Sequence, residues 1–217
     1  MLLPTGGTPV AKLNQIDIEC IRSEFEAIRY NVQWQLAGSG NQTGINYKET
    51  DDLDSRHISL TAPRGGGTDK NVLKEGPVIH RKYTYYNVEY NNTLIKSILE
   101  HYDCFGSRIT VVEPGTCLRW HDDRAFNFDD SYYRLHIPIY SDPGNHFAFD
   151  SGLYRLEPGW LYLVDTTRKH TFFNASNQDR YHIIGNTDMT KKMNEVLATG
   201  DISSGWGKLD KGYFNRE

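Results

Sequence analysis

The fold is decided by residues 132–164, which read YYRLHIPIYSDPGNHFAFDSGLYRLEPGWLYLV. Short runs rich in aromatic and aliphatic side chains alternate here with the turn residues Asp142-Pro143-Gly144 and Pro158-Gly159. Proline presets a turn dihedral and glycine accepts a positive one, so this tripeptide and this dipeptide are expected to end strands. Strands spaced by about eight to ten residues predict a sandwich or barrel rather than alternating β and α units.

The same pattern continues on both sides of this stretch. The expected strands are Arg108 to Val112, Cys117 to Trp120, Tyr132 to Tyr140, His146 to Phe149, Leu153 to Leu156, Trp160 to Val164, His170 to Phe173 and Arg180 to Asn186. Eight such strands predict a mainly β protein with a double-stranded β-helix, the two-sheet jelly roll of cupin-like proteins.

Helical patterns flank these strands. Apolar residues recur at three- and four-residue steps over Ile16 to Arg29, and a second helix is expected from the N-cap candidate Asn92 to about Tyr102. Between them we expect strands at Asn31 to Leu36 and Arg56 to Thr61, and a glycine-rich loop at residues 63–67 that is either a lid or a solvated connection. A short helix is expected from Met189 to about Leu197.

The chain is expected to form one domain over residues 1–217. Residues 1–105 would supply the N-terminal support and the substrate side, residues 106–188 the β-helix core, and residues 189–217 the last helix and tail. The helices expected over Ile16 to Arg29 and Asn92 to about Tyr102 would pack on the outside of the sheet.

Composition excludes several classes of partner. A charged content of 24% and a formal net charge of −4 favour neither nucleic acid nor anionic membrane. No segment resembles a signal peptide or a membrane span, so we expect a cytoplasmic protein. Cys20, Cys104 and Cys117 lack metal-site spacing and are expected to be free thiols.

One short motif offers two metal ligands. His121 and Asp123 stand at i and i+2, so both can project from one side of a strand end while Asp122 points away. A triplet of this kind arises easily by chance and alone indicates only a polar turn. His170 strengthens the hypothesis because it begins a strand after the apolar run Trp160 to Val164. Two imidazoles and one carboxylate are a typical donor set for redox iron.

Arg180 follows His170 by ten residues and is the candidate clamp for an acidic cosubstrate. If residues 174–180 formed a hairpin with Asn174 opposite Arg180, the arginine would lie about 13 Å along the strand from the metal ligands. A C5 dicarboxylate and an arginine side chain together span that gap, and a guanidinium can grip a carboxylate through two hydrogen bonds.

Three more polar residues share these strands. Arg134 and His136 alternate with the apolar residues Tyr133, Leu135 and Ile137, which indicates one polar face directed inward. They either contact the cosubstrate or form an internal hydrogen-bond network. His182 lies two residues after Arg180 on the same face and could support it. An apolar wall around the site could come from Trp120, Trp160, Phe147, Phe149 and Phe172.

Several separate motifs, in order over about 80 residues, resemble the aspartyl/asparaginyl β-hydroxylase family, which includes small bacterial proline hydroxylases. The matching runs are residues 108–115, His121-Asp122-Asp123, residues 134–139, residues 157–160, Val164-Asp165, His170, Asn174 and Asp179-Arg180.

The resemblance implies a double-stranded β-helix that uses Fe(II), 2-oxoglutarate and O₂. Carried over by position, His121, Asp123 and His170 become the iron ligands and Arg180 anchors the C5 carboxylate of 2-oxoglutarate. Arg134 and His136 would then lie close to the cosubstrate. Animal members that act on protein domains lack the carboxylate ligand, so Asp123 makes this chain more similar to members acting on free amino acids.

Three other functions stay open at this stage. The target could be an Asp, Asn or Pro side chain in a polypeptide instead of a small-molecule amino acid. The chain could be a cupin-like binding module without turnover. Two histidines and a carboxylate can also hold catalytic zinc, although zinc hydrolysis gives no role to Arg180.

Overall fold

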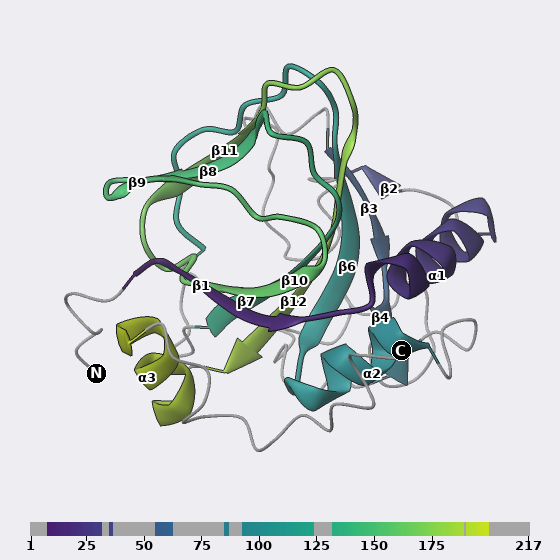
Figure 1. Ribbon diagram of the computed structural model, residues 1–217, viewed down its shortest axis with the longest axis horizontal. Coiled ribbons are helices and arrows are strands. Elements are labelled where there is room, and N and C mark those ends of the chain that lie inside the picture. The colour runs from purple at the N-terminus through teal and green to yellow at the C-terminus, as the bar shows by residue number, and fades with distance from the viewer. Residues whose placement is uncertain are drawn as a thin grey trace, which may run out of the picture.

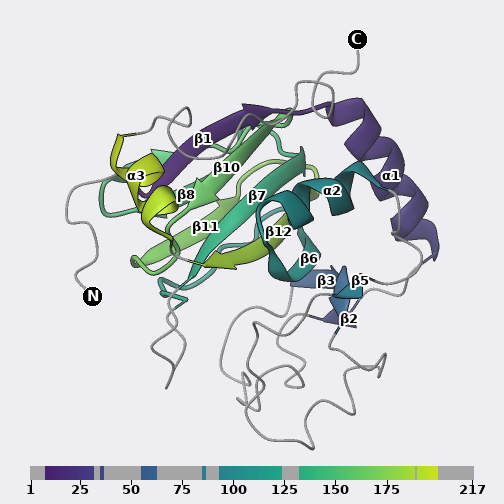
Figure 2. The same cartoon turned by 90° about the horizontal axis from the view of Figure 1, so that it is seen from below.

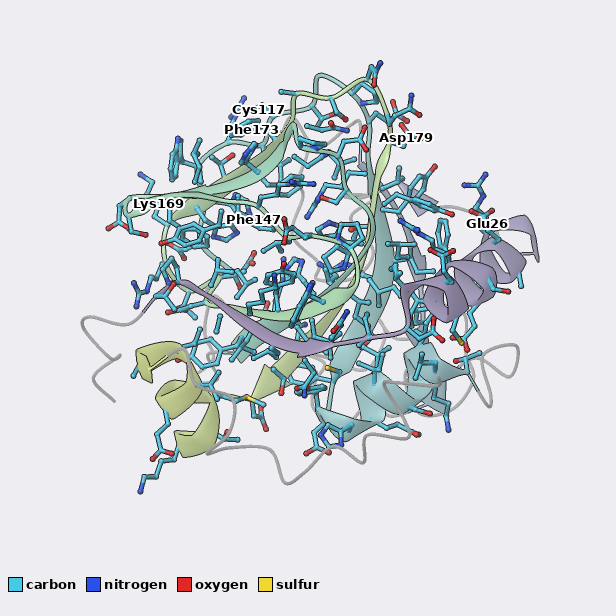
Figure 3. All side chains as sticks on the ribbon, viewed as in Figure 1. Glu26, Cys117, Phe147, Lys169, Phe173 and Asp179 are labelled. Carbon is cyan, nitrogen blue, oxygen red and sulfur yellow. The ribbon has the colours of Figure 1, made fainter. Side chains whose placement is uncertain are left out.

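The computed structural model describes residues 8–31, 35–36, 55–62, 85–86, 93–123, 132–188 and 190–199. Two antiparallel sheets face each other (Figure 1), and side chains fill the interior between them (Figure 3). The larger sheet has the order β1 (Val10–Gln15), β10 (Trp160–Val164), β7 (Tyr132–Tyr140), β12 (Arg180–Asp188), β6 (Phe105–Val112), β3 (Ser55–Ser59) and β2 (Gln35–Leu36).

The smaller sheet has the order β11 (His170–Asn174), β8 (Asn145–Phe149) and β9 (Gly152–Tyr154). The short strands β4 (Thr61–Ala62) and β5 (Tyr85–Tyr86) pair separately. Isolated bridges join Cys117 to Phe173 and His121 to His170, so residues 117–121 run beside β11. The expected mainly β, double-stranded β-helix fold is therefore confirmed.

Three helices cover the outer face of the larger sheet, away from the smaller one (Figure 2). They are α1 (Ile18–Asn31), α2 (Leu94–His101) and α3 (Lys191–Thr199). Within the described residues no helix is both long and apolar enough to cross a membrane.

Alternation along β12 and β7 separates two environments. Ile183 and Leu135 belong to the hydrophobic core beneath the helices, together with Phe25 of α1 and Ile98 of α2. The neighbouring residues of the same strands point to the interior between the sheets, because successive side chains of a strand take opposite faces. A smaller apolar cluster of Phe147, Phe149, Leu156, Tyr162 and Val164 fills part of that interior.

The strand boundaries follow the sequence closely in the centre of the chain. β7 and β10 begin and end where the alternation and turn residues predicted. The edge strand β1 was not predicted; it pairs with β10, with Val10 opposite Val164. The loop at residues 63–67 lies outside the described residues, and so do residues 200–217 of the tail.

Four predictions at the flanks and connections were wrong. Thr93 rather than Asn92 caps α2, because its side chain accepts a hydrogen bond from the Lys96 amide. Residues 117–120 form no continuous strand, only the isolated bridges. Asn31 ends α1 instead of starting a strand, which leaves only Gln35–Leu36 as β2. Over 56–61 the expected single strand is interrupted at Leu60 and divided between β3 and β4.

The hairpin expected at residues 174–180 was also wrong. β11 pairs with β8, whereas β12 pairs with β6 and β7, so the chain crosses from the smaller to the larger sheet after Asn174. The Asn174 side chain donates hydrogen bonds to the carbonyls of Val112 (2.9 Å) and Gln178 (2.8 Å). These bonds fix the crossing, and they place Arg180 across the interior from His170 rather than along a shared ladder.

Candidate metal centre

Backbone pairing brings the two candidate histidine ligands together. His121 and His170 exchange two backbone hydrogen bonds, of 2.9 and 2.8 Å, and their ring centroids are 4.4 Å apart. The Asp123 amide donates to the carbonyl of Thr166 at 2.9 Å. Residues from two distant segments are thereby held at fixed positions by main-chain bonds.

Both histidine rings are oriented in the same way. Nδ1 of His121 lies 2.7 Å from the carbonyl oxygen of Arg119, and Nδ1 of His170 lies 2.9 Å from that of Arg168. A carbonyl oxygen can only accept, so each Nδ1 carries the proton and each Nε2 keeps a free lone pair. This is the tautomer in which an imidazole binds a metal through Nε2.

Asp123 faces both lone pairs. His121 Nε2 lies 3.9 Å from its Oδ1, and His170 Nε2 lies 3.8 Å from its Oδ2. One donor atom from each of the three residues lies within 4.8 Å of the other two. Two metal bonds of about 2.1 Å span at most about 4.2 Å. Small side-chain adjustments would therefore bring all three donors onto one ion.

The charge state of Asp123 suits a ligand. Burial alone would raise the pKa of its carboxyl, but Arg134, His170 and His121 outweigh burial and hold that pKa below its ordinary value. Arg134 Nη1 lies 3.0 Å from Oδ2, yet this buried oxygen accepts no hydrogen bond from the described residues. The contact is therefore an ion pair whose N–H is not directed at the oxygen. Oδ2 keeps a lone pair for a cation.

His170 is prepared to act as a neutral ligand. Burial lowers the pKa of its imidazole, and the opposing influence of Asp123 does not cancel that effect. The ring therefore stays unprotonated at neutral pH. Neutral imidazoles with a carboxylate form a borderline donor set that fits Fe(II) as well as Zn(II).

A second polar group lies deeper between the sheets, on β12 and β7. Arg180, His182 and His136 are 4%, 1% and 3% exposed. Arg180 Nη2 lies 2.8 Å from His182 Nδ1, its Nε lies 3.2 Å from His182 Nε2, and His182 Nδ1 lies 3.5 Å from His136 Nδ1. A neutral imidazole accepts through one nitrogen only, so at most one of the Arg180 contacts is a hydrogen bond.

The Arg180 group carries a positive charge that no carboxylate of the described residues balances. No carboxylate among the described residues forms an ion pair with Arg180, and burial lowers the pKa of its guanidinium to about 9. Burial, followed by the charge of Arg180, also holds the pKa values of His136 and His182 well below the ordinary histidine value. The group is thus one cation beside two neutral rings, which is a strong attraction for a buried anion.

Aromatic rings separate and line the two groups. The Arg180 guanidinium lies over Phe147 and Phe172, at 5.2 and 5.0 Å from the ring centroids. Phe149 stacks on His170 at 5.6 Å, and Figure 3 shows Phe147 pointing into the interior. These three of the five proposed wall residues lie at the site. Trp120 is 50% exposed. Trp160 packs at the margin of the interior apolar cluster, with the Lys12 Nζ 4.1 Å from its ring centroid.

All seven residues selected from the sequence lie between the two sheets or at their edge. His121, Asp123 and His170 converge, Arg134 joins them through Asp123, and Arg180, His182 and His136 form the neighbouring group. Sequence reasoning missed the carbonyls of Arg119 and Arg168, which have no sequence signal. It also assigned no role to Asp165, although an aspartate that starts a Thr-Thr-Arg turn is a recognisable turn signal.

Residues 83–188 match the family model described as aspartyl/asparaginyl beta-hydroxylase. No curated protein matches the chain.

Among solved structures, a 2OG-Fe(II) oxygenase family oxidoreductase from Burkholderia pseudomallei is similar at 9% identity and a TM-score of 0.49, over 82% of this chain and 83% of that one. The viral collagen prolyl hydroxylase of Paramecium Bursaria Chlorella virus-1 is similar at 12% identity and a TM-score of 0.43, over 83% and 96%. A cupin domain from Bordetella pertussis matches at 18% identity and a TM-score of 0.29, over 37% and 79%.

Proposed function

We propose a reaction from the premise that this chain belongs, through residues 83–188, to the aspartyl/asparaginyl β-hydroxylase family. Members of that family are Fe(II)- and 2-oxoglutarate-dependent oxygenases, and this is the enzyme class of the chain. The proposed reaction is hydroxylation of an unactivated C–H bond of an amino acid or of an amino-acid side chain.

The orientation of the two imidazoles carries the proposal. Both Nδ1 atoms are engaged by backbone carbonyls, which leaves the Nε2 lone pairs of His121 and His170 directed toward the Asp123 carboxylate. We assign Fe(II) to these three residues. Together with 2-oxoglutarate and O₂, bound Fe(II) supplies the oxidising power for C–H hydroxylation, and 2-oxoglutarate leaves as succinate and CO₂.

Arg180 is proposed to hold the cosubstrate. Its buried guanidinium faces the interior from β12 and forms no ion pair with a described carboxylate, so it can pair with the C5 carboxylate of 2-oxoglutarate through two hydrogen bonds. His182 restricts the rotation of the guanidinium, because its ring lies within 2.8 Å of Nη2. His136 is proposed to contact the cosubstrate between Arg180 and the metal ligands.

Arg134 and the aromatic rings are proposed to have supporting roles at the site. Arg134 keeps Asp123 ionised and lies near enough to the ligands to contact the C1 carboxylate of 2-oxoglutarate. Phe147, Phe149 and Phe172 exclude water from the interior, which strengthens the charge interactions there. Positioning and desolvation are thus the main contributions of the protein itself.

A small free amino acid is the preferred substrate, because Asp123 is present as a third ligand. A polypeptide side chain is the alternative within the same chemistry. The two are distinguished by the panel in the experiment below.

The test is succinate formation. Protein purified without oxygen is supplied with Fe(II), ascorbate, 2-oxoglutarate and O₂, together with single amino acids or with peptides that contain Asp, Asn or Pro. Succinate release stimulated by one amino acid or peptide, with an added hydroxyl group detected by mass spectrometry, is expected. Metal binding without succinate would favour a non-catalytic cupin-like module, and iron-independent hydrolysis of the peptides would favour zinc chemistry.

A further inference from the structure

The turn between β10 and β11 begins with a buried aspartate. Asp165 is 2% exposed, and its carboxylate accepts hydrogen bonds from the amide (3.2 Å) and hydroxyl (2.5 Å) of Thr167. It also accepts from Nε of Arg168 at 3.0 Å. Three donors of the same turn therefore converge on one side chain, and they set the direction of the peptide groups between residues 165 and 168.

Two carbonyls of this turn hold metal-ligand residues. The Thr166 carbonyl accepts from the Asp123 amide at 2.9 Å. The Arg168 carbonyl accepts from Nδ1 of His170 at 2.9 Å, the bond that leaves His170 Nε2 unprotonated. His121 depends on the same turn indirectly, because its backbone pairs with that of His170.

The turn is also anchored at its start. The Asp165 amide donates to the carbonyl of Pro9 at 2.8 Å, next to the edge strand β1. The Arg168 amide closes the turn on the Asp165 carbonyl at 3.3 Å. Asp165 is thus fixed by its main chain, and its side chain shapes the rest of the turn.

From these contacts we propose that Asp165 is a positioning residue of the metal centre. Its carboxylate folds residues 165–168 so that the Arg168 carbonyl fixes the Nδ1–H tautomer of His170 and the Thr166 carbonyl fixes Asp123. The inference rests on the proposed metal site and extends it to a residue that binds neither the metal nor the cosubstrate.

Replacing one Asp165 carboxylate oxygen by an amide NH₂ group shows why the negative charge of this side chain matters. In Asp165→Asn the new Nδ2 group is a donor, and it faces either Arg168 Nε or the Thr167 donors. One part of the turn must rotate away. The Arg168 carbonyl then moves, and His170 is free to adopt the tautomer with a proton on Nε2, which cannot bind a metal through that nitrogen.

The first measurement is the ring tautomer of each histidine, read from ¹⁵N chemical shifts of the metal-free protein at pH 8. In the wild type, His121 and His170 are expected as Nδ1–H tautomers. In Asp165→Asn, His170 is expected to become a mixture, while His121 keeps its tautomer because its own partner is the Arg119 carbonyl.

The second measurement is the affinity for Co(II), titrated without 2-oxoglutarate or O₂. Loss of a residue that orients a ligand typically weakens metal binding by about ten- to hundredfold, and this range is expected for Asp165→Asn. Thr187→Val is the matched control: Thr187 is fully buried and its hydroxyl donates to the Tyr102 carbonyl at 2.8 Å, away from the metal centre. It is expected to lower stability and leave the Co(II) affinity unchanged.

A milder variant covers the case in which Asp165→Asn does not fold. Thr167→Val removes only the hydroxyl donor and keeps the amide bond to Asp165. It is expected to shift the His170 tautomer in the same direction by a smaller amount.

The outcomes separate this inference from the proposed function. If folded Asp165→Asn and Thr167→Val keep the wild-type His170 tautomer and Co(II) affinity, the positioning role is wrong, although the oxygenase proposal stands. Equal loss of affinity in Asp165→Asn and Thr187→Val would also overturn it, since a purely structural effect would suffice. A wild type that binds Co(II) and forms no succinate would overturn the oxygenase proposal alone.

Discussion

The metal centre and the Arg180 group lie in the same interior, but the protein holds them in opposite ways. The three proposed metal ligands, His121, Asp123 and His170, are held by main-chain hydrogen bonds, and Arg134 forms an ion pair with the Asp123 carboxylate. Arg180, His182 and His136 are held by side chains, are almost completely buried, and include a cation without a described carboxylate partner. The proposed metal site is therefore arranged before any metal binds, whereas the Arg180 group holds a buried positive charge that a bound anion would stabilise.

The difference has a physical origin. A metal site needs fixed directions, which backbone carbonyls and strand pairing supply at little entropic cost. An anion site needs an unpaired positive charge in a medium of low dielectric constant. Such a charge destabilises the protein when no ligand is bound. Loss of function is therefore expected from changes in either region, but only changes in the Arg180 group should raise the stability of the ligand-free protein.

The largest effect is expected from Asp123→Ala. Removing the carboxylate of the proposed metal centre should lower iron-dependent succinate formation by more than the roughly hundredfold typical of residues around the ligands. It should also lower the Co(II) affinity. Asp122→Ala is the neighbouring control and should retain near-wild-type values; equal losses in both variants would remove Asp123 from the ligand set.

Arg180→Met should act on the cosubstrate instead of the metal. Breaking a buried ion pair costs about 3 kcal/mol, which corresponds to a rise on the order of hundredfold in the 2-oxoglutarate requirement. The Co(II) affinity should stay close to that of the wild type. Steady-state kinetics against 2-oxoglutarate concentration tests this, and an unchanged requirement would place the anchor elsewhere.

The same variant should stabilise the ligand-free protein. Methionine resembles the arginine stem in volume and needs no counter-ion, so the free energy of unfolding should rise by about 1 kcal/mol or more. Urea denaturation measures this change. 2-Oxoglutarate should stabilise the wild type and not Arg180→Met. Arg155→Met, which changes a 37% exposed arginine, should show neither effect; a stability loss in Arg180→Met would contradict the interpretation that the buried charge destabilises the protein.

The smallest expected effect is a decrease in the free energy of unfolding as the pH falls below about 6.5. His136 and His182 have pKa values well below the ordinary value, because of burial and then Arg180. Below a pH of about 6.5 the unfolded chain binds protons at these rings while the native state does not. Stability is therefore fully present above that pH and falls as the pH decreases. Each ring contributes up to about 1.4 kcal/mol per pH unit.

His182→Gln isolates one of these protons. The loss of stability between pH 6.5 and 5.5, measured by urea denaturation, should be smaller by roughly 1 kcal/mol in the variant than in the wild type. The double variant His136→Gln/His182→Gln should remove about twice as much. An identical pH dependence in all three proteins would mean that these rings are protonated in the native state.

The sequence predicted the boundaries of the central strands better than it predicted which strands pair with one another. β7 and β10 were predicted at their observed boundaries because turn residues bracket a regular alternation. Alternation does not specify the partner of a strand, and for this reason the crossing between Asn174 and Arg180 was mistaken for a hairpin. The edge strand β1 has only a short apolar signal and was missed.

The candidate site shows the same division. His121, Asp123, His170 and Arg180 carry side-chain chemistry that a sequence displays directly. The carbonyls that orient the histidines belong to Arg119 and Arg168, and nothing in those side chains predicts such a role. The turn shaped by Asp165 became visible only when the hydrogen bonds of the folded chain were traced.

The most direct test of the metal centre is anomalous X-ray diffraction at the iron absorption edge, from crystals exposed to Fe(II) without oxygen. One iron peak per chain is expected, bonded to Nε2 of His121, Nε2 of His170 and the carboxylate of Asp123. A peak at other residues, or none where these three side chains converge, would contradict the assignment.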